Sequence, residues 1–587
     1  MRSDMKQVHR HTTLVSCLAL LGMQLHAQTP PVASSALPQG AKVVSGQATV
    51  TQTAPNALAV GQTSNRAVLD WNSFNIGSQA SVQFNQPSAN SVVLNRVLDT
   101  NPSQIMGRLS ANGQVFISNP QGVLFGPNAQ VNVAGLVATT QAISVDEFNK
   151  FGAALAVNGH QGAVVNQGQI TAALGGYIAL LAPEVRNEGV LLAREGTVAL
   201  AAGSKTILQF ADNKLVSVLV EQSVMDALVV NKQVIRADGG LVILSARSAN
   251  AILGSVIQQS GTIETLSLVS REGRVFLDGG PQGQVDMSGQ ISAAGAAAGT
   301  RGGEVVVTGD KVSIGSQARV DASGQAGGGK VLIGGDWQGQ NPLIRQANEV
   351  MVKPGAVLNA SALNKGNGGT VVVWSNTRNP NGSTQVQGQL LARGGALGGD
   401  GGRIETSGHQ LNTNGVQGDA GATAGTAGTW LFDPWNVEIT AASVNNNESS
   451  GTWSASGSSS TIANTAINNL LNAGTNVTVT TGSSGSETGN ITVNAPITQL
   501  GTAPAARLTL TANQDIAIND TITLTKSGSK LELNAGNATS GGNIALTGAV
   551  ATDTLNMNLT GTGTVTQTAA VNANNLRISG TGTQVTL

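Results

Sequence analysis

The stretch "VVNQGQITAALGGYIALLAPE" (164–184) and the stretch that follows it, "VRNEGVLLAREGTVALAAG" (185–203), are two copies of one pattern. Each copy reads Asn-x-Gly, an apolar residue, alanine, glycine and a short apolar strand. The two asparagines, Asn166 and Asn187, are 21 residues apart. A unit of about 20 residues is too short to bury its own apolar face, so it needs a neighbour on each side. The pattern therefore predicts units that stack as successive turns of a coil.

The unit recurs with insertions, which extends the prediction over most of the chain. Further copies are "VVNKQVIRADGGLVILSAR" (229–247), "QQSGTIETLSLVSREGRVFLDGG" (258–280), "DMSGQISAAGAAAGTRGGEVVVTG" (286–309), "VDASGQAGGGKVLIGG" (320–335), "LNASALNKGNGGTVVVWS" (358–375) and "VQGQLLARGGALGGDGGRIETSG" (386–408). Parallel stacking buries Val, Ile and Leu and lets Asn, Ser and Thr form ladders at the corners. We expect an all-β fold, a right-handed parallel β-helix, whose Gly-rich insertions at 293–303 and 392–402 project from one side.

The expected dimensions follow from the spacing of β-strands. If residues 48–430 form coils of roughly 22 residues, each rising about 4.8 Å, there are about 17 coils in a rod roughly 80 Å long. We expect this rod to be monomeric.

Composition agrees with such a fold and excludes one class of partner. The 587 residues include 75 Gly, but only 11% are charged and 3% aromatic, against roughly 25% charged in an ordinary soluble domain. Gly and Asn tolerate the positive φ angles of tight corners. The net charge of −1 gives no electrostatic reason to expect nucleic acid as a partner.

The first 27 residues have the pattern of a secretory signal peptide. A basic segment that contains Arg2 precedes the apolar run "LVSCLALLGMQL" (14–25), and Leu25-His26-Ala27 is a suitable cleavage site. We expect cleavage after Ala27. A lipoprotein site at Cys17 is the alternative, although Cys17 lies too early in the apolar run. Because Cys17 is the single cysteine, cleavage leaves a chain without any.

A corner interrupts the clean strand pattern of "NGQVFISNPQGVLFGPNAQVNVAGLVATT" (112–140). Apolar and polar residues alternate on both sides of Asn119-Pro120-Gln121-Gly122. Pro120 cannot donate a hydrogen bond to a sheet, and Asn-Pro initiates turns. The stretch therefore predicts a strand, a corner and a second strand.

Two longer blocks carry a resemblance to a known family. The blocks "LDWNSFNIGSQASVQFNQPSANSVVLNRV" (69–97) and "IMGRLSANGQVFISNPQGVLFGPNAQVNVAGLVATT" (105–140) resemble the secretion domain of two-partner secretion exoproteins. These are the filamentous haemagglutinin-like proteins, and the similarity is greatest to the high-molecular-weight adhesin and haemopexin-binding subtype. The resemblance covers about residues 36–280.

The resemblance implies a secretion determinant at the corner. The family's motif there is Asn-Pro-Asn-Gly, so Asn119, Pro120 and Gly122 carry over, while Gln121 replaces an asparagine. A second family motif, Asn-Pro-Asn-Leu, is not found, because the corresponding stretch reads "FNQPSANSVVLNRV" (84–97).

The resemblance also implies a route and partners. After signal-peptide export, an outer-membrane β-barrel transporter with periplasmic domains recognises the N-terminal domain and exports the chain. The product is a secreted or surface-exposed adhesin that binds a receptor or glycan on host or bacterial cells. Two alternatives stay open: a carrier of a toxin or polysaccharide-active enzyme, and a haem- or haemopexin-binding protein.

Changes in composition predict the division of the chain. The expected parts are a signal peptide (1–27), a secretion domain with an N-terminal cap and extrahelical loops (28–280), a Gly-rich β-helical continuation (281–440), a low-complexity linker (441–460) and a β-rich passenger segment (461–587). The passenger begins with a helical period over 461–481, formed by Ile462, Ala466, Ile467, Leu470 and Leu471, before strands resume at 489–492.

The search for catalytic or metal-binding residues gives no candidate. Only His160 and His409 lie beyond the signal peptide, and two isolated histidines support neither a zinc site nor a triad. The carboxylate pairs Asp310 with Asp321 and Asp278 with Asp286 lie on neighbouring units without a basic cluster beside them. We expect no catalysis, cofactor or metal.

Overall fold

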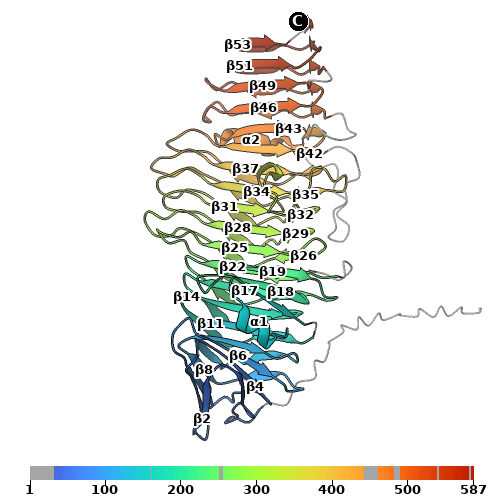
Figure 1. Ribbon diagram of the computed structural model, residues 1–587. Helices are drawn as coiled ribbons and strands as arrows, with labels where there is room; N and C mark the ends of the chain where they lie inside the picture. Colours follow the sequence, from blue (N-terminus) through green and yellow to red (C-terminus); the bar gives the residue numbers. More distant parts are fainter. Residues whose placement is uncertain are drawn as a thin grey trace, which may run out of the picture. The chain divides into compact units, whose positions relative to one another are not determined.

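The computed structural model of the protein describes residues 32–159, 161–249, 255–441, 460–481, 489–537, 541–580 and 584–586. Val32–Leu587 form one compact unit. In this unit, short parallel strands are stacked in rows, and each turn of the chain contributes one strand to each row (Figure 1). The predicted all-β fold, a parallel β-helix, is confirmed.

Each coil passes through three rows in a fixed order. In one coil these strands are β26 (Gln284–Met287), β27 (Gln290–Ser292) and β28 (Glu304–Thr308). The strands of the next coil, β29, β30 and β31, pair with them in parallel and in register. We call the rows that contain β26, β27 and β28 the first, second and third rows.

The rows contain most of the strands of the described chain. The first row contains β7 (Ser103–Ile105), β10 (Val123–Phe125), β13 (Ala163–Asn166), β15 (Glu184–Asn187), β20 (Leu228–Asn231), β23 (Ile257–Gln259), β26, β29 (Lys311–Ile314), β32 (Glu349–Val352), β35 (Ser383–Val386), β38 (Gln410–Asn412), β41 (Val437–Thr440), β42 (Ser460–Ala463), β44 (Ile491–Val493), β47 (Ile516–Ile518), β50 (Ile544–Leu546), β52 (Thr564–Gln567) and β54 (Gln584–Thr586). The second row contains β5 (Ser81–Asn85), β8 (Arg108–Ala111), the first parts of β11 (Gln130–Thr139) and β14 (Gln169–Ala182), β16 (Val190–Leu192), β21 (Val234–Arg236), β24 (Thr262–Glu264), β27, β30 (Arg319–Asp321), β33 (Val357–Asn359), β36 (Gln389–Leu391), β39 (Gln417–Asp419), β45 (Ile497–Thr498) and β48 (Ile522–Leu524). The third row contains β6 (Val92–Val97), β9 (Gln114–Ser118), the last parts of β11 and β14, β17 (Thr197–Ala202), β22 (Leu241–Ala246), β25 (Arg274–Asp278), β28, β31 (Lys330–Ile333), β34 (Thr370–Trp374), β37 (Arg403–Ser407), β40 (Thr429–Asp433), β43 (Asn476–Thr480), β46 (Arg507–Ala512) and β49 (Lys530–Ala535). β51 (Val550–Leu559) and β53 (Val571–Ser579) span the second and third rows.

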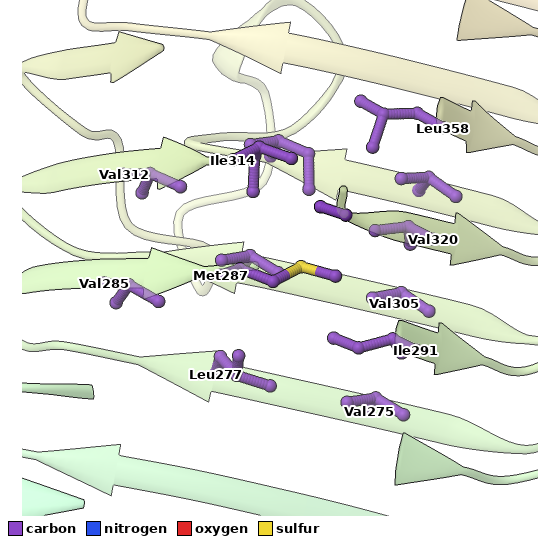
Figure 2. Close-up of a cluster of buried hydrophobic side chains, with 14 of the residues drawn as sticks. Val275, Leu277, Val285, Met287, Ile291, Val305, Val312, Ile314, Val320 and Leu358 are labelled. Atoms are coloured by element: carbon purple, nitrogen blue, oxygen red, sulfur yellow. The ribbon is translucent and has the colours of Figure 1, made fainter. Parts of the chain in front are cut away.

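Aliphatic side chains fill the interior of the coils. Alternate residues of all three rows point inward, as Figure 2 shows for Val275 and Leu277 from the third row, Val285 and Met287 from the first, and Ile291 from the second. All five are almost completely buried. Such stacking of like residues explains why aromatic side chains are not needed for a continuous core.

A ladder of buried amides closes the corner between the first and second rows. The Nδ2 group of Asn166 donates to Oδ1 of Asn187 at 2.8 Å, Asn187 to Asn231 at 2.8 Å, and Asn231 to Oε1 of Gln259 at 2.8 Å. All four side chains are fully buried. Each amide satisfies the next, so burial leaves these polar groups paired. The asparagine step seen in the sequence is this ladder.

A second ladder consists of glycines before the third-row strands. A Cβ atom on Gly303, Gly329 or Gly369 would lie 2.0 Å from the carbonyl oxygen of the glycine one coil earlier. A methyl group cannot occupy that space. This close approach of the coils requires glycine at each step and explains part of the glycine content.

The Gly-rich insertions continue the stack outside the coil. The amide of Gly328 donates to the carbonyl of Asn367 at 3.0 Å, and that of Gly368 to Asp400 at 2.9 Å. These loops connect the second and third rows, and Figure 1 shows loops on one side of β28, β31, β34 and β37. The insertions therefore project from one side, as predicted, and are hydrogen-bonded to one another.

A cap and an extrahelical sheet distinguish the N-terminal coils. β1 (Lys42–Ser45) pairs antiparallel with β4 (Arg66–Trp71), and β2 (Ala48–Ala54) with β3 (Ala57–Gln62). β12 (Ala154–Asn158), β18 (Lys205–Ala211) and β19 (Lys214–Gln222) form an antiparallel sheet. With α1 (Val145–Lys150), this sheet encloses a second core on the outer side of the third row. The sequence predicted the cap and only loops outside the helix.

Aromatic packing and one arginine hold α1 in place. The ring of Phe116 packs edge-on against Phe148 at 5.9 Å between centroids. The guanidinium of Arg66 donates to the carbonyls of Phe148, Asn149 and Phe151 at 2.9, 2.8 and 2.7 Å. Carbonyls at a helix end lack partners within the helix, so Arg66 caps α1.

The stack continues past the predicted linker. Of residues 441–460, the segment 442–459 lies outside the described residues. β41 pairs in parallel with β42 and β44, and β40 with β43. The coils that follow thus extend the same rows. The division into a continuation, a linker and a passenger stays a prediction.

The helical period after the linker corresponds to α2 (Asn464–Asn472), which buries Ala466, Ile467, Leu470 and Leu471. α2 contacts β39 and β45 and lies where a second-row strand would lie. Two boundaries differ from the prediction. Ile462 belongs to β42, and strands resume already at β43, because the helical turn replaces one strand of a coil and no more.

Candidate recognition corner

The predicted corner connects β9 to β10, from the third row to the first. Oδ1 of Asn119 accepts a hydrogen bond from the amide of Gln121 at 3.0 Å, and the Gly122 amide donates to the carbonyl of Asn119 at 3.0 Å. Asparagine favours such a turn because its side chain caps the backbone two residues on. Gly122 has a φ of +135°, which disfavours any other residue there.

The buried half of the corner is anchored to the preceding coil. Nδ2 of Asn119 donates to the carbonyl of Asn101 at 3.1 Å and to Oγ of Ser103 at 3.0 Å. Asn119 is 0% exposed, and the carbonyl of Gly122 accepts from the Ser103 amide at 3.0 Å. Asn119 and Gly122 therefore fix the corner and present no side chain to a partner.

The other half of the corner faces solvent. Pro120 and Gln121 are both exposed. The four predicted residues are thus brought together in one turn but have different surroundings. Two hold the turn, and two are available for contact.

A second Asn-Pro turn escaped the sequence search, although its sequence is an exact copy of the family motif. Asn379-Pro380-Asn381-Gly382 connects β34 to β35. Oδ1 of Asn379 accepts from the Asn381 amide at 3.0 Å, and the Gly382 amide donates to the Asn379 carbonyl at 2.7 Å. The turn repeats the two hydrogen bonds of residues 119–122, but Gly382 lacks the left-handed φ of Gly122. Its anchor is weaker, because Asn379 is half-buried and its Nδ2 donates to Oδ1 of Asn348.

The other residues considered from the sequence either make structural contacts or lie outside the described residues. In the stretch 84–97, Gln86 is buried and its Nε2 donates to Oε1 of Gln62 at 3.0 Å and to the carbonyl of Ser91 at 3.1 Å. Ala27 and His160 lie outside the described residues. The ring of His409 packs on Trp435 at 4.6 Å between centroids.

The four candidate carboxylates accept hydrogen bonds from neighbouring side chains or backbone amides. Asp310 accepts from Asn348 at 2.6 Å and Asp321 from Asn359 at 3.1 Å. Asp278 accepts from the amide of Gly280 at 2.9 Å, and Asp286 from Gln284 at 2.8 Å. Among the described residues, no group of three or more His, Cys, Asp and Glu is arranged to hold a metal ion.

One buried carboxylate has a strongly shifted pKa. Glu405 of β37 lies under residues 334–347, which we call the strap, and is 0% exposed. Its oxygens accept from the Gln338 amide at 2.8 Å and from Oγ of Ser407 at 2.9 Å. Burial raises the pKa of Glu405 to about 8 and that of nearby Asp433 to about 7. Both oxygens of Glu405 accept hydrogen bonds and are buried, so we interpret Glu405 as a residue that holds the strap against β37.

Comparisons with known proteins identify the region around the corner. Residues 34–293 match the family model of the TPS secretion domain, the domain of two-partner secretion. A heme/hemopexin-binding protein of Haemophilus influenzae is 35% identical over 253 residues, which are 41% of this chain and 27% of that protein. Another protein of the same name from Haemophilus influenzae is 43% identical over 116 residues, or 20% of this chain and 12% of the relative.

A solved structure supports the assignment. The HMW1 secretion domain from Haemophilus influenzae is 30% identical, with a TM-score of 0.59, over 68% of this chain and 100% of that domain. The chain belongs to the two-partner secretion exoproteins. Exoproteins of this family are secreted through the periplasm to the cell surface.

The family assignment separates the two Asn-Pro turns. The secretion domain includes residues 119–122 and ends before residues 379–382. The matches with the two heme/hemopexin-binding proteins span 27% and 12% of their lengths. Among the residues that the structure describes, no helix combines the length and apolar character needed to cross a membrane.

Proposed function

We propose that this exoprotein is an adhesin exported by a cognate outer-membrane β-barrel transporter, whose periplasmic domains recognise the secretion domain at residues 119–122. The observation that carries the proposal is the division of the corner. Asn119 and Gly122 hold the turn, while Pro120 and Gln121 are exposed on it. A rigid turn with two exposed side chains is suited to recognition, because little conformational entropy is lost on binding.

Variants of the exposed half test recognition apart from folding. We expect Pro120→Ala with Gln121→Ala to reduce the amount of protein released when the transporter is co-expressed, while thermal unfolding of the purified chain stays close to that of the parent. Asn119→Ala removes the buried anchor and lowers both quantities. Parental release of the Pro120 and Gln121 variant would show that the corner has only a structural role.

We further propose that the exported chain binds surface receptors or glycans and does no catalysis. Three observations support this reading. Its relatives are named as binding proteins, the candidate carboxylates are engaged in structural hydrogen bonds, and Asn, Thr and Ser line long rows outside the core. Many weak contacts along such rows act together once the first has formed. Cells that display the protein should bind epithelial cells or each other more than cells that lack it.

A haem- or haemopexin-binding protein is the second candidate, on the strength of the relatives' name alone. Titration of the purified chain with haem and with haemopexin separates the two functions. Saturable binding of either, without cell adhesion, favours the second candidate.

A further inference from the structure

A charged trough crosses the outer face of the third row from β25 to β37. It has a volume of about 530 Å³. Its floor is made of paired glycines at 302–303, 328–329, 368–369 and 401–402, so the backbone forms the base without side chains. Charged side chains form the rim. The lining residues come from successive coils, so the trough runs along the stack, as suits an extended ligand.

Cations outnumber anions around the trough. Arg274, Arg301, Lys330 and Arg403 face the two glutamates Glu272 and Glu304. The chain as a whole carries a net charge of −1, so the positive rim is a local feature. It favours an anionic ligand.

The rim cations are only loosely paired within the protein. Arg274 and Lys330 each lie 3.6 Å from Glu304. The well-formed pairs of the same molecule are closer, such as Arg96 with Asp70 at 2.7 Å. Arg274 and Lys330 are 53% and 60% exposed, so solvent weakens their contacts with Glu304. These cations can exchange an internal partner for a ligand at little cost.

Two of the cations are held in position by aromatic rings. The guanidinium of Arg274 lies over Phe276 at 5.1 Å, and that of Arg403 over Trp337 at 4.6 Å. Stacking on a ring restricts the side chain and leaves the edge of the guanidinium accessible to sulfate or carboxylate. The internal contacts that a ligand would compete with are long, 3.3 Å from Nη2 of Arg403 to Oγ1 of Thr370 and 3.6 Å from Nε of Arg274 to Glu304. The two ends of the trough are therefore ordered before a ligand binds.

The spacing of the cations is regular. Arg274, Glu304, Lys330, Thr370 and Arg403 occupy equivalent positions on five successive third-row strands. A cation thus recurs at every second strand, which corresponds to about 10 Å. That distance is similar to the length of a disaccharide. Nucleic acid carries its phosphates much more densely, about 3.4 Å apart along each strand. In addition, the rings of Phe276 and Trp337 are already stacked with arginines, so they are not available to stack on a base.

We propose that this trough binds a linear acidic polysaccharide, which lies along the coil stack with its anionic groups on Arg274, Lys330 and Arg403. The inference rests on the adhesin function proposed above, for which it names the ligand class. Direct binding by purified protein depends neither on export nor on cell adhesion, so a failure here is distinct from a failure of the proposed function.

Calorimetric titration of the purified chain with heparin and with polygalacturonate tests the proposal. Heparin carries sulfates and polygalacturonate only carboxylates, so the comparison identifies the anion. We expect at least one polymer to bind, with affinity that falls as salt is added. Fragments too short to reach from Arg274 to Arg403 should bind more weakly than longer ones. Uncharged dextran should not bind.

A matched pair of variants locates the site. Arg274→Gln with Lys330→Gln should weaken binding about tenfold or more. Arg378→Gln with Lys526→Gln removes the same charges elsewhere and should leave affinity unchanged. Circular dichroism checks that both variants fold. Absence of binding to both acidic polymers, or equal weakening by the two pairs of substitutions, would overturn the proposal.

Discussion

The secretion domain (34–293) and the Gly-rich coils after it share one β-helix but are stabilised by different additions. The secretion domain has an amide ladder, an extrahelical sheet and a second core rich in aromatic residues. The later coils have Gly-rich loops that are joined to one another by backbone hydrogen bonds, and a strap that is held by Glu405. Both contain an Asn-Pro turn that is closed by the same asparagine side-chain hydrogen bond. The comparison shows that the repeat determines the coil, while the corner ladder, the loops and the extrahelical elements give each region its own properties.

The largest effect is expected in the glycine ladder, which begins in the secretion domain and continues into the later coils. Gly329→Ala places a methyl group 2.0 Å from the carbonyl oxygen of Gly303, so the coils must move apart. We expect the free energy of unfolding of the later coils to fall by about 4 kcal/mol or more. Chemical denaturation of the purified chain measures the loss. Gly152→Ala, which meets no atom within 4 Å, is the control, and an equal loss in the two variants would contradict the ladder.

The strap should make the later coils sensitive to pH. The pKa of Glu405 is about 8 in the folded chain and close to its ordinary value when unfolded, so the folded state holds a proton that the unfolded state releases. Stability therefore falls as pH rises from about 4.5 to 8. Glu405→Gln should stabilise the chain on the order of 3 kcal/mol at pH 8 and much less at pH 5.

Thermal unfolding at the two pH values measures this difference. Glu438→Gln, at an exposed position, controls for the loss of one negative charge. A Glu405 variant that gains the same stability at both pH values would show that the carboxyl group is not buried in the neutral form.

In the secretion domain the corresponding test concerns Arg66. Arg66→Ala removes three hydrogen bonds to the carbonyls at the end of α1, and we expect a loss of about 2 kcal/mol. Hydrogen exchange should show faster opening of α1 and β12, with little change in the later coils. Uniform acceleration along the chain would mean that the extrahelical sheet is not a separately stabilised unit.

The smallest effect is expected at Gln121. Gln121→Asn gives the corner at 119–122 the same sequence as the turn at 379–382. The residue is exposed, only its backbone amide takes part in the turn, and asparagine keeps the side-chain amide that a partner would contact, so unfolding and export should both match the parent. A clear gain in released protein would show that the transporter distinguishes asparagine from the longer glutamine at this position.

The repeat made the coil, the amide ladder and the glycine insertions predictable, because each recurs at the same place in successive units. The extrahelical strands were missed since "KTILQFADNKLVSVLVEQ" (205–222) has the same alternation as strands inside the coil. The turn at 379–382 could have been found by reading its four residues. The partners of Asn119 could not, because Asn101 and Ser103 reach it only through the stacking of coils.

Release into the medium, measured for two matched variants, tests the central claim most directly. One variant carries Asn119→Ala and Pro120→Ala, and the other Asn379→Ala and Pro380→Ala, each co-expressed with the transporter. We predict that the first is cleaved by signal peptidase but not released, whereas the second is released like the parent. Normal release of the first variant, or equal loss in both, would contradict recognition at residues 119–122.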